Sequence, residues 1–123
     1  MVVEMHTDEE VKKCSVDSIN AYIEQGKSFR LETTALPNDM YATVSKWNDD
    51  VVCFLRDLYG RSPVCYRRGS AFEAELRRPA NAGERFALLI GHLEGLLGEI
   101  KNGNDCFFKR WNQDEAIRVA CMQ

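Results

Sequence analysis

The longest stretch with helical periodicity runs from Asn81 to Gly103, and it constrains the fold more than any other segment. Its apolar residues recur every three or four positions, as the core-facing side of an α-helix requires. Asn81 suits an N-cap with Glu84 three residues later, and Gly103 suits a left-handed C-cap. The pattern predicts a helix over about 82–101. Its buried face would consist of Phe86, Leu89, Ile90, Leu93, Leu97 and Ile100.

The opposite side of the same predicted helix carries a stripe of small residues. Gly91, Gly95 and Gly98 follow one another at helical spacing, beside Ala87. A glycine inside a helix costs roughly 1 kcal/mol relative to alanine, so we expect the stripe to allow close approach of another backbone. That backbone could belong to a second helix of this chain, to another copy or to a partner, and tolerated drift is the remaining alternative. The three glycines are therefore the predicted helix-contact or oligomer face.

Length and composition predict one domain that spans residues 1–123. The 123 residues with 45% hydrophobic content suffice for one core. The acidic start, MVVEMHTDEE, has neither a basic region nor an apolar stretch, so residues 1–6 are expected to be a loose terminus of a cytoplasmic protein. Charges along the central helix argue against a membrane span. The five cysteines lack paired spacing, so we predict reduced thiols, with no metal and no cofactor.

Further helical patterns flank the central one. Helices are predicted over about 8–25, with Gly26 at the end, and over about 39–59, with Gly60 as C-cap. The second of these would bury Tyr41, Val44, Trp47, Val51, Phe54, Leu55 and Leu58. Another helix would begin at Ser62-Pro63 and run toward Leu76, and a short one would begin at Asp114. Residues 104–123 would pack on the bundle through aromatic side chains. The predicted fold is an all-α, single-domain bundle of four to five helices around the glycine-striped helix.

The net charge of −3 conceals a basic segment, because all six basic residues between positions 61 and 85 are arginines. Arginine presents a rigid fork that suits carboxylates and phosphates. Three interpretations stay open: pairing with the acidic first half of the chain, binding of an acidic protein partner, and binding of a small phosphate or nucleotide. The acidic balance of the whole chain argues against nucleic-acid binding. The predicted partner or ligand residues are Tyr66, Arg67, Arg68, Arg77 and Arg78.

Enzymatic chemistry has little support in the residues. Neither His6 nor His92 stands in a recognisable catalytic or metal-binding motif, and both are interpreted as structural or surface residues. Cys65 is the one candidate nucleophile, because Arg67 and Arg68 could lower its pKa. We predict a protein that is not an enzyme.

A family resemblance rests on two groups of positions. The first is Trp47, Phe54-Leu55, Leu58-Tyr59-Gly60 and Ser62, and the second is Phe86, Leu89-Ile90, Gly95-Leu96-Leu97 and Ile100-Lys101. Together they resemble the small helical domain that often precedes a TIR-like nucleotide-binding or effector domain in bacterial defence proteins. The resemblance covers about residues 40–101. The sequence departs from that pattern in its aromatic C-terminal piece and in having no effector domain after the helices.

The resemblance implies an accessory or assembly domain, which could act as an adaptor, an inhibitor or a phage-encoded antagonist. Combined with the glycine face and the arginine segment, it predicts a cytoplasmic helical module for protein–protein association, either with itself or with a partner. The alternative is a binder of a small phosphorylated ligand or nucleotide that uses the arginine cluster.

Overall fold

The computed structural model describes residues 8–31, 36–60 and 66–103, and these ranges contain four α-helices and no strand. The helices are α1 (Asp8–Ser28), α2 (Tyr41–Gly60), α3 (Tyr66–Glu75) and α4 (Ala82–Lys101), and the 3-10 turn η1 (Asn38–Met40) leads into α2. The prediction of an all-α bundle is confirmed. None of these helices combines the length and the apolar character that crossing a bilayer requires.

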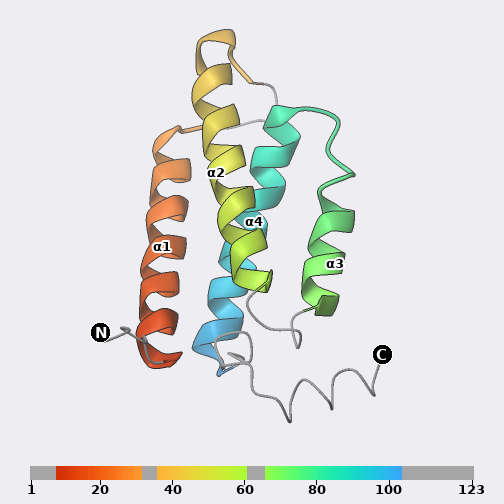
Figure 1. The fold of residues 1–123 in the computed structure, drawn as a ribbon. Helices are drawn as coiled ribbons and strands as arrows, with labels where there is room; N and C mark the ends of the chain where they lie inside the picture. Colours follow the sequence, from red (N-terminus) through yellow and green to blue (C-terminus); the bar gives the residue numbers. More distant parts are fainter. Residues whose placement is uncertain (1–7, 32–35, 61–65, 104–123) are drawn as a thin grey trace, which may run out of the picture.

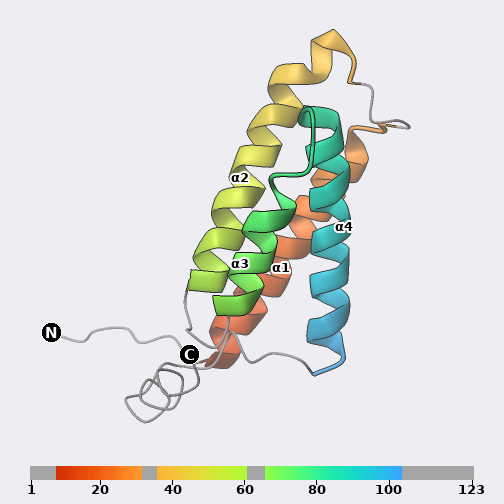
Figure 2. The same cartoon turned by 90° about the vertical axis from the view of Figure 1, so that its right-hand side faces the viewer.

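The four helices run alternately up and down, so each is antiparallel to its neighbour in sequence (Figure 1). α2 packs against α1, α3 and α4, and α4 also packs against α1. As a result, α1 and α3 lie on opposite sides of the α2–α4 pair (Figures 1 and 2). The glycine-striped helix α4 therefore packs against both α1 and α2.

One hydrophobic core joins all four helices. α4 contributes Leu89, Leu93 and Ile100 as predicted, together with Leu96, which the predicted face did not include. The other helices complete the core with Ile19 and Ile23 from α1, Trp47, Val51, Leu55 and Leu58 from α2, and Phe72 from α3. On the predicted α2 face, Val44, Trp47, Val51, Leu55 and Leu58 are buried and Phe54 is partly buried, whereas Tyr41 is 61% exposed.

Both ends of α4 follow the capping pattern expected from the sequence. The Asn81 side chain accepts a hydrogen bond from the Glu84 amide at 2.9 Å, and the Glu84 carboxylate accepts one from the Ala80 amide at 2.6 Å. These contacts satisfy donors that a helix start leaves without partners. At the other end, Gly103 has a φ of 88°, the left-handed conformation that glycine adopts most readily.

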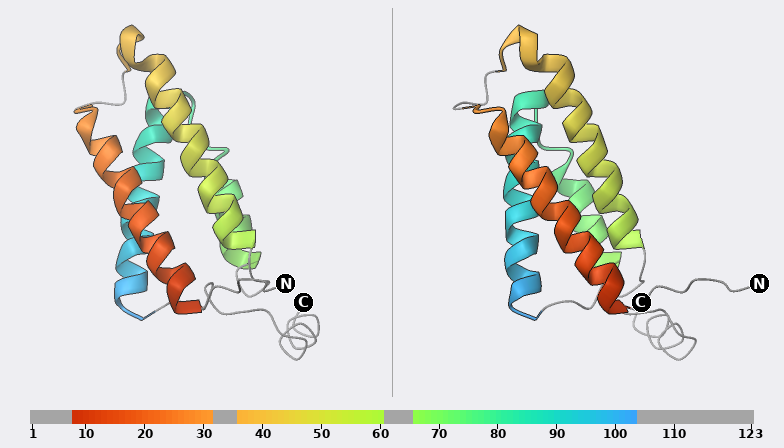
Figure 3. Two further views of the ribbon diagram at one scale, coloured as in Figure 1. Left: turned by 60° about the vertical axis from the view of Figure 1, so that its left-hand side comes forward. Right: turned by 90° about the vertical axis from the view of Figure 1, so that its left-hand side faces the viewer.

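The end of α1 differs from the prediction that Gly26 stops the helix. Gly26 lies inside α1, which continues to Ser28, and Arg30 takes the left-handed conformation beyond it with φ of 53°. A Cβ atom at Gly26 would stand only 2.6 Å from Ile90 Cδ1 and 3.0 Å from Trp47 Cζ2. The glycine is thus required by close packing of α1 against α2 and α4, which local sequence could not show. Figure 3 shows α1 inclined to α4.

Other predictions differ from the structure or fall outside it. Gly60 is the last residue of α2 and not a left-handed C-cap. The expected helix start at Ser62-Pro63, the candidate nucleophile Cys65, the loose terminus 1–6 and the aromatic segment 104–123 with its short helix lie outside the described residues.

Candidate functional site

A pocket of about 250 Å³ lies between α3 and α4, on the side of the bundle away from α1. Its walls come from the last turns of α2, the length of α3 and the second half of α4. The lining includes both polar and apolar residues, namely Tyr59, Arg68, Ala71, Phe72, Glu75, His92, Gly95, Leu96 and Glu99. Side chains, rather than close backbone packing, bridge α3 and α4 here.

His92 occupies the centre of a hydrogen-bonded chain that spans three helices. Its Nε2 lies 2.6 Å from the Tyr59 hydroxyl, and its Nδ1 lies 3.3 Å from Glu75 Oε2. An ionised carboxylate only accepts, so Nδ1 carries the proton and donates to Glu75, while Nε2 accepts from Tyr59 O–H. The imidazole also packs against Phe72, with the ring centroids 4.8 Å apart. The interpretation of His92 as a structural histidine agrees with this environment, although no local pattern pointed to Tyr59 and Glu75 as its partners.

The pKa of His92 lies below its ordinary value of 6.5, chiefly because burial penalises the imidazolium. The nearby carboxylates of Glu75 and Glu99 oppose this shift, and Arg68 adds to it. The neutral imidazole is therefore the stable form at neutral pH.

Stability should accordingly depend on pH through His92. The unfolded chain binds a proton near pH 6.5 more readily than the folded chain does, so the free energy of unfolding should fall as the pH drops through and below that value. We expect His92→Gln to remove this part of the decline. Urea unfolding at about pH 7.5 and about pH 5.5 measures it.

The control is His6→Gln, which removes the other histidine of the sequence and should leave the decline unchanged. An equally steep decline in His92→Gln would show that the proton is taken up elsewhere.

The same pocket holds an ion pair between Arg68 on α3 and Glu99 on α4. Their side chains are 30% and 44% exposed, so solvent screens the pair and its net stabilisation is small. A second pair joins α3 to α2, where Arg56 donates to both Glu73 oxygens at 2.7 and 3.0 Å. That contact raises the pKa of Arg56 and lowers the pKa of Glu73, mainly through the hydrogen bonds. Ion pairs thus join α3 to both α2 and α4, although neither pair contributes much to stability.

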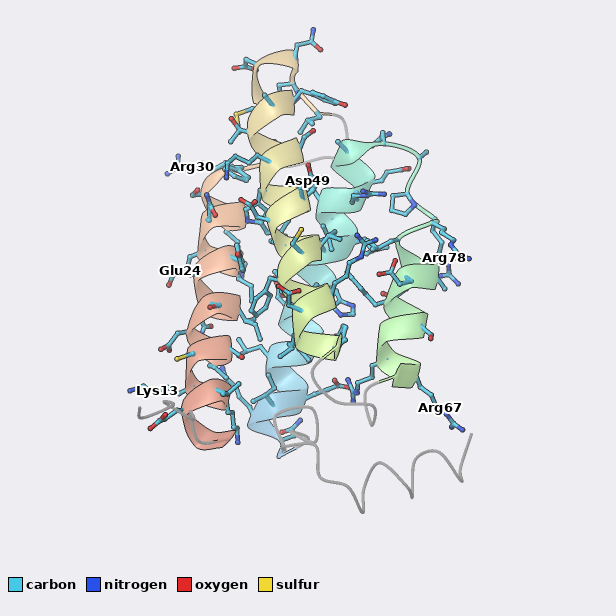
Figure 4. The ribbon with its side chains drawn as sticks, viewed as in Figure 1. Lys13, Glu24, Arg30, Asp49, Arg67 and Arg78 are labelled. Carbon is cyan, nitrogen blue, oxygen red and sulfur yellow. The ribbon has the colours of Figure 1, made fainter. Side chains whose placement is uncertain are left out.

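The five predicted ligand residues do not converge on one site. Arg67 points outward from the start of α3, and Arg78 points outward from the segment that follows the end of α3 (Figure 4). Arg68 is engaged with Glu99, whereas Arg77 lines a different hollow, between α2 and α3. The Tyr66 side chain lies outside the described part of the structure. Of the interpretations offered for the arginines, intramolecular pairing accounts for Arg68, but its partner is on α4 and not in the acidic first half.

The predicted glycine face points away from the core. A Cβ atom placed at Gly91, Gly95 or Gly98 would meet nothing within 4 Å, as far as the described residues extend. The close approach expected within the chain therefore occurs at Gly26 and not at this stripe, for the part of the chain that the structure covers. Gly95 has a second property, because it also lines the α3–α4 pocket.

The described ranges contain no group of three or more His, Cys, Asp or Glu residues placed to hold a metal ion. The two cysteines among them, Cys14 and Cys53, are exposed free thiols on α1 and α2. The chain matches no protein-family model, no curated protein and no solved structure.

Proposed function

We propose that this chain is a helical association module, and that its contact surface is the open ridge formed by Gly91, Gly95 and Gly98. The observation that carries the proposal is the empty space over all three positions, within the described chain, where a Cβ atom would meet nothing. Together the glycines cost about 3 kcal/mol relative to alanine, and no contact among the described residues offsets that cost. A helix laid on the ridge would offset it through close backbone packing.

The pocket beside Gly95 supports the same proposal. A side chain of a bound helix could enter next to Gly95 and reach Leu96 and Phe72, which line the pocket floor together with polar groups. This arrangement is similar to knobs-into-holes packing, in which a side chain of one helix inserts into a space between residues of the facing helix.

The proposed occupant is the same ridge of a second copy. A two-fold contact needs only one self-complementary surface, and two-fold homodimers are the commonest soluble oligomers. The ridge suits self-pairing because glycine places no side chain between the two helices. The wider role suggested by the family resemblance, an adaptor, assembly factor or inhibitor in the cytoplasm in bacterial or phage defence, stays a prediction.

Gly95→Leu tests the proposal. A leucine at the ridge should separate the two helices and shift a dimer to monomer, as measured by sedimentation equilibrium. The monomer's melting temperature should not fall, because leucine favours a helix more than glycine does and the site is open. Gly60→Leu is the matched control, since Gly60 is equally open but lies on α2. A monomeric native protein, or a dimer unaffected by Gly95→Leu, would refute self-association through this ridge.

The alternative, a phosphorylated ligand on the arginine cluster, has less support because Arg67 lies at the start of α3 and Arg78 lies beyond its other end (Figure 4). A thermal-shift screen with nucleotides tests it directly. A ligand at 100 times its dissociation constant would add about 2.7 kcal/mol to the stability.

A further inference from the structure

A hollow of about 530 Å³ lies between α2 and α3, within the usual size range of small-molecule sites. Gly60 and Gly69 line it, one from each helix. Among the described residues, a Cβ atom at Gly60 would meet nothing within 4 Å, and one at Gly69 would meet the Tyr59 Cβ at 3.6 Å. The hollow therefore exists in part because both of its walls lack a side chain at these positions.

The inner surface of the hollow is apolar. The rings of Tyr59 and Phe72 line it, and only 6% and 1% of these residues is exposed. The same two rings line the α3–α4 pocket, so they lie between the two hollows. A hydrocarbon group placed against them would be removed from water, which is favourable.

The rim of the hollow carries three charges that do not cancel. Arg56 donates to both oxygens of Glu73, at 2.7 and 3.0 Å. These hydrogen bonds are the main cause of the lowered pKa of Glu73, and the nearby charge of Arg77 adds to the shift. The Arg77 guanidinium lines the hollow and makes no hydrogen bond or ion pair within the described part of the chain. Two guanidinium groups and one carboxylate thus leave one positive charge without a counterion.

We propose that this hollow binds a small carboxylate whose hydrocarbon body enters between Gly60 and Gly69. The carboxylate would accept two hydrogen bonds from Arg77, because the planar guanidinium matches the spacing of two carboxylate oxygens. The hydrocarbon body would lie against Tyr59 and Phe72. Since arginine binds phosphate as well as carboxylate, the apolar inner surface is what favours a ligand with a hydrocarbon body.

The test is an NMR titration of the isotope-labelled protein with hexanoate and with benzoate at neutral pH. At least one of them should shift the Gly60 and Gly69 amides and the Arg77 Nε–H signal in a saturable way. Acetate, hexan-1-ol and inorganic phosphate each lack the hydrocarbon body or the charge, and they should bind at least about tenfold more weakly. No saturable shift with hexanoate or benzoate, or equal binding of any of these three probes, would overturn the proposal.

Two changes at the rim should act in opposite directions. Arg77→Gln removes the guanidinium and should weaken binding by about tenfold, whereas Glu73→Gln removes a neighbouring negative charge and should strengthen it. Arg78→Gln is the matched control, because Arg78 points outward, and it should leave the affinity unchanged (Figure 4). Equal affinities in Arg77→Gln and Arg78→Gln, or weaker binding in Glu73→Gln, would overturn the assignment of the carboxylate to Arg77.

The binding site is independent of the proposed association surface, because the hollow lies between α2 and α3 and the glycine ridge is on α4. Gly95→Leu should therefore leave the affinity for the carboxylate unchanged. Either proposal can fail alone.

Discussion

Phe72→Ala should lower the free energy of unfolding by about 3–5 kcal/mol. Phe72 is 1% exposed and stands in the short helix α3, whose burial depends on Phe72 and Leu76. Its ring contacts Tyr59 and His92 with centroids 5.9 and 4.8 Å apart. Removing it would leave a cavity where α2, α3 and α4 meet. Urea unfolding followed by circular dichroism measures the loss.

Two further variants make the Phe72 experiment specific. Phe72→Leu keeps most of the apolar volume and should cost far less, about 1.5 kcal/mol or below. Ser70→Ala changes an exposed residue of the same helix and should stay within about 0.5 kcal/mol of the native protein. If Phe72→Ala cost no more than Ser70→Ala, α3 would not be docked on the core in solution.

Gly26→Ala should lower the free energy of unfolding by about 1–3 kcal/mol, although alanine favours a helix more than glycine does. The added methyl group would stand 2.6 Å from Ile90 Cδ1, 3.0 Å from Trp47 Cζ2 and 3.3 Å from Phe86 Cε2. The end of Ile90 can turn aside. The indole of Trp47 is restrained, because its Nε1–H donates to the Tyr22 carbonyl at 3.0 Å. Strain at the α1–α2–α4 junction therefore outweighs the gain in helix propensity.

Gly91→Ala is the control, and we expect it to stabilise the protein. An added methyl group at Gly91 would meet nothing within 4 Å, so the free energy of unfolding should rise by about 0.5–1 kcal/mol. The measurement belongs at low protein concentration, where association does not contribute to stability. Combining Gly26→Ala with Ile90→Val, which removes the nearest methyl group, should recover part of the loss. Changes of the same sign in Gly26→Ala and Gly91→Ala would contradict the packing described for α1.

The parts of the fold that depend on neighbouring residues in sequence could be predicted from the sequence. The capping by Asn81 and Glu84, the left-handed Gly103 and the buried stripe of α4 all follow from spacings within one or two helical turns. The role of Gly26 could not be inferred in this way. Its neighbours Trp47 and Ile90 are distant in sequence, and a glycine near the end of a helical pattern has the same local signature as a C-cap.

The candidate sites were predictable only in part, because their residues come from segments that are distant in sequence. Tyr59, Glu75 and His92 come from three helices, and no local pattern joins them. The arginines of α3 are close in sequence, yet a helix directs successive side chains about 100° apart, so Arg67 and Arg68 take different surroundings. By contrast, the three glycines of α4 share a face because their spacing matches the helical repeat.

The absence of a side chain at Gly26 has a mechanical consequence for the bundle. Elsewhere along α1 and α4, side chains set the distance between the helix axes, so a change in their volume can move the helices apart. At Gly26 no side chain separates α1 from Ile90 and Trp47, and the Trp47 indole is held by its hydrogen bond to the Tyr22 carbonyl. We therefore expect this position to act as a pivot near one end of α1. Volume changes among residues such as Val11, close to the other end, should therefore tilt α1 about that pivot rather than translate it.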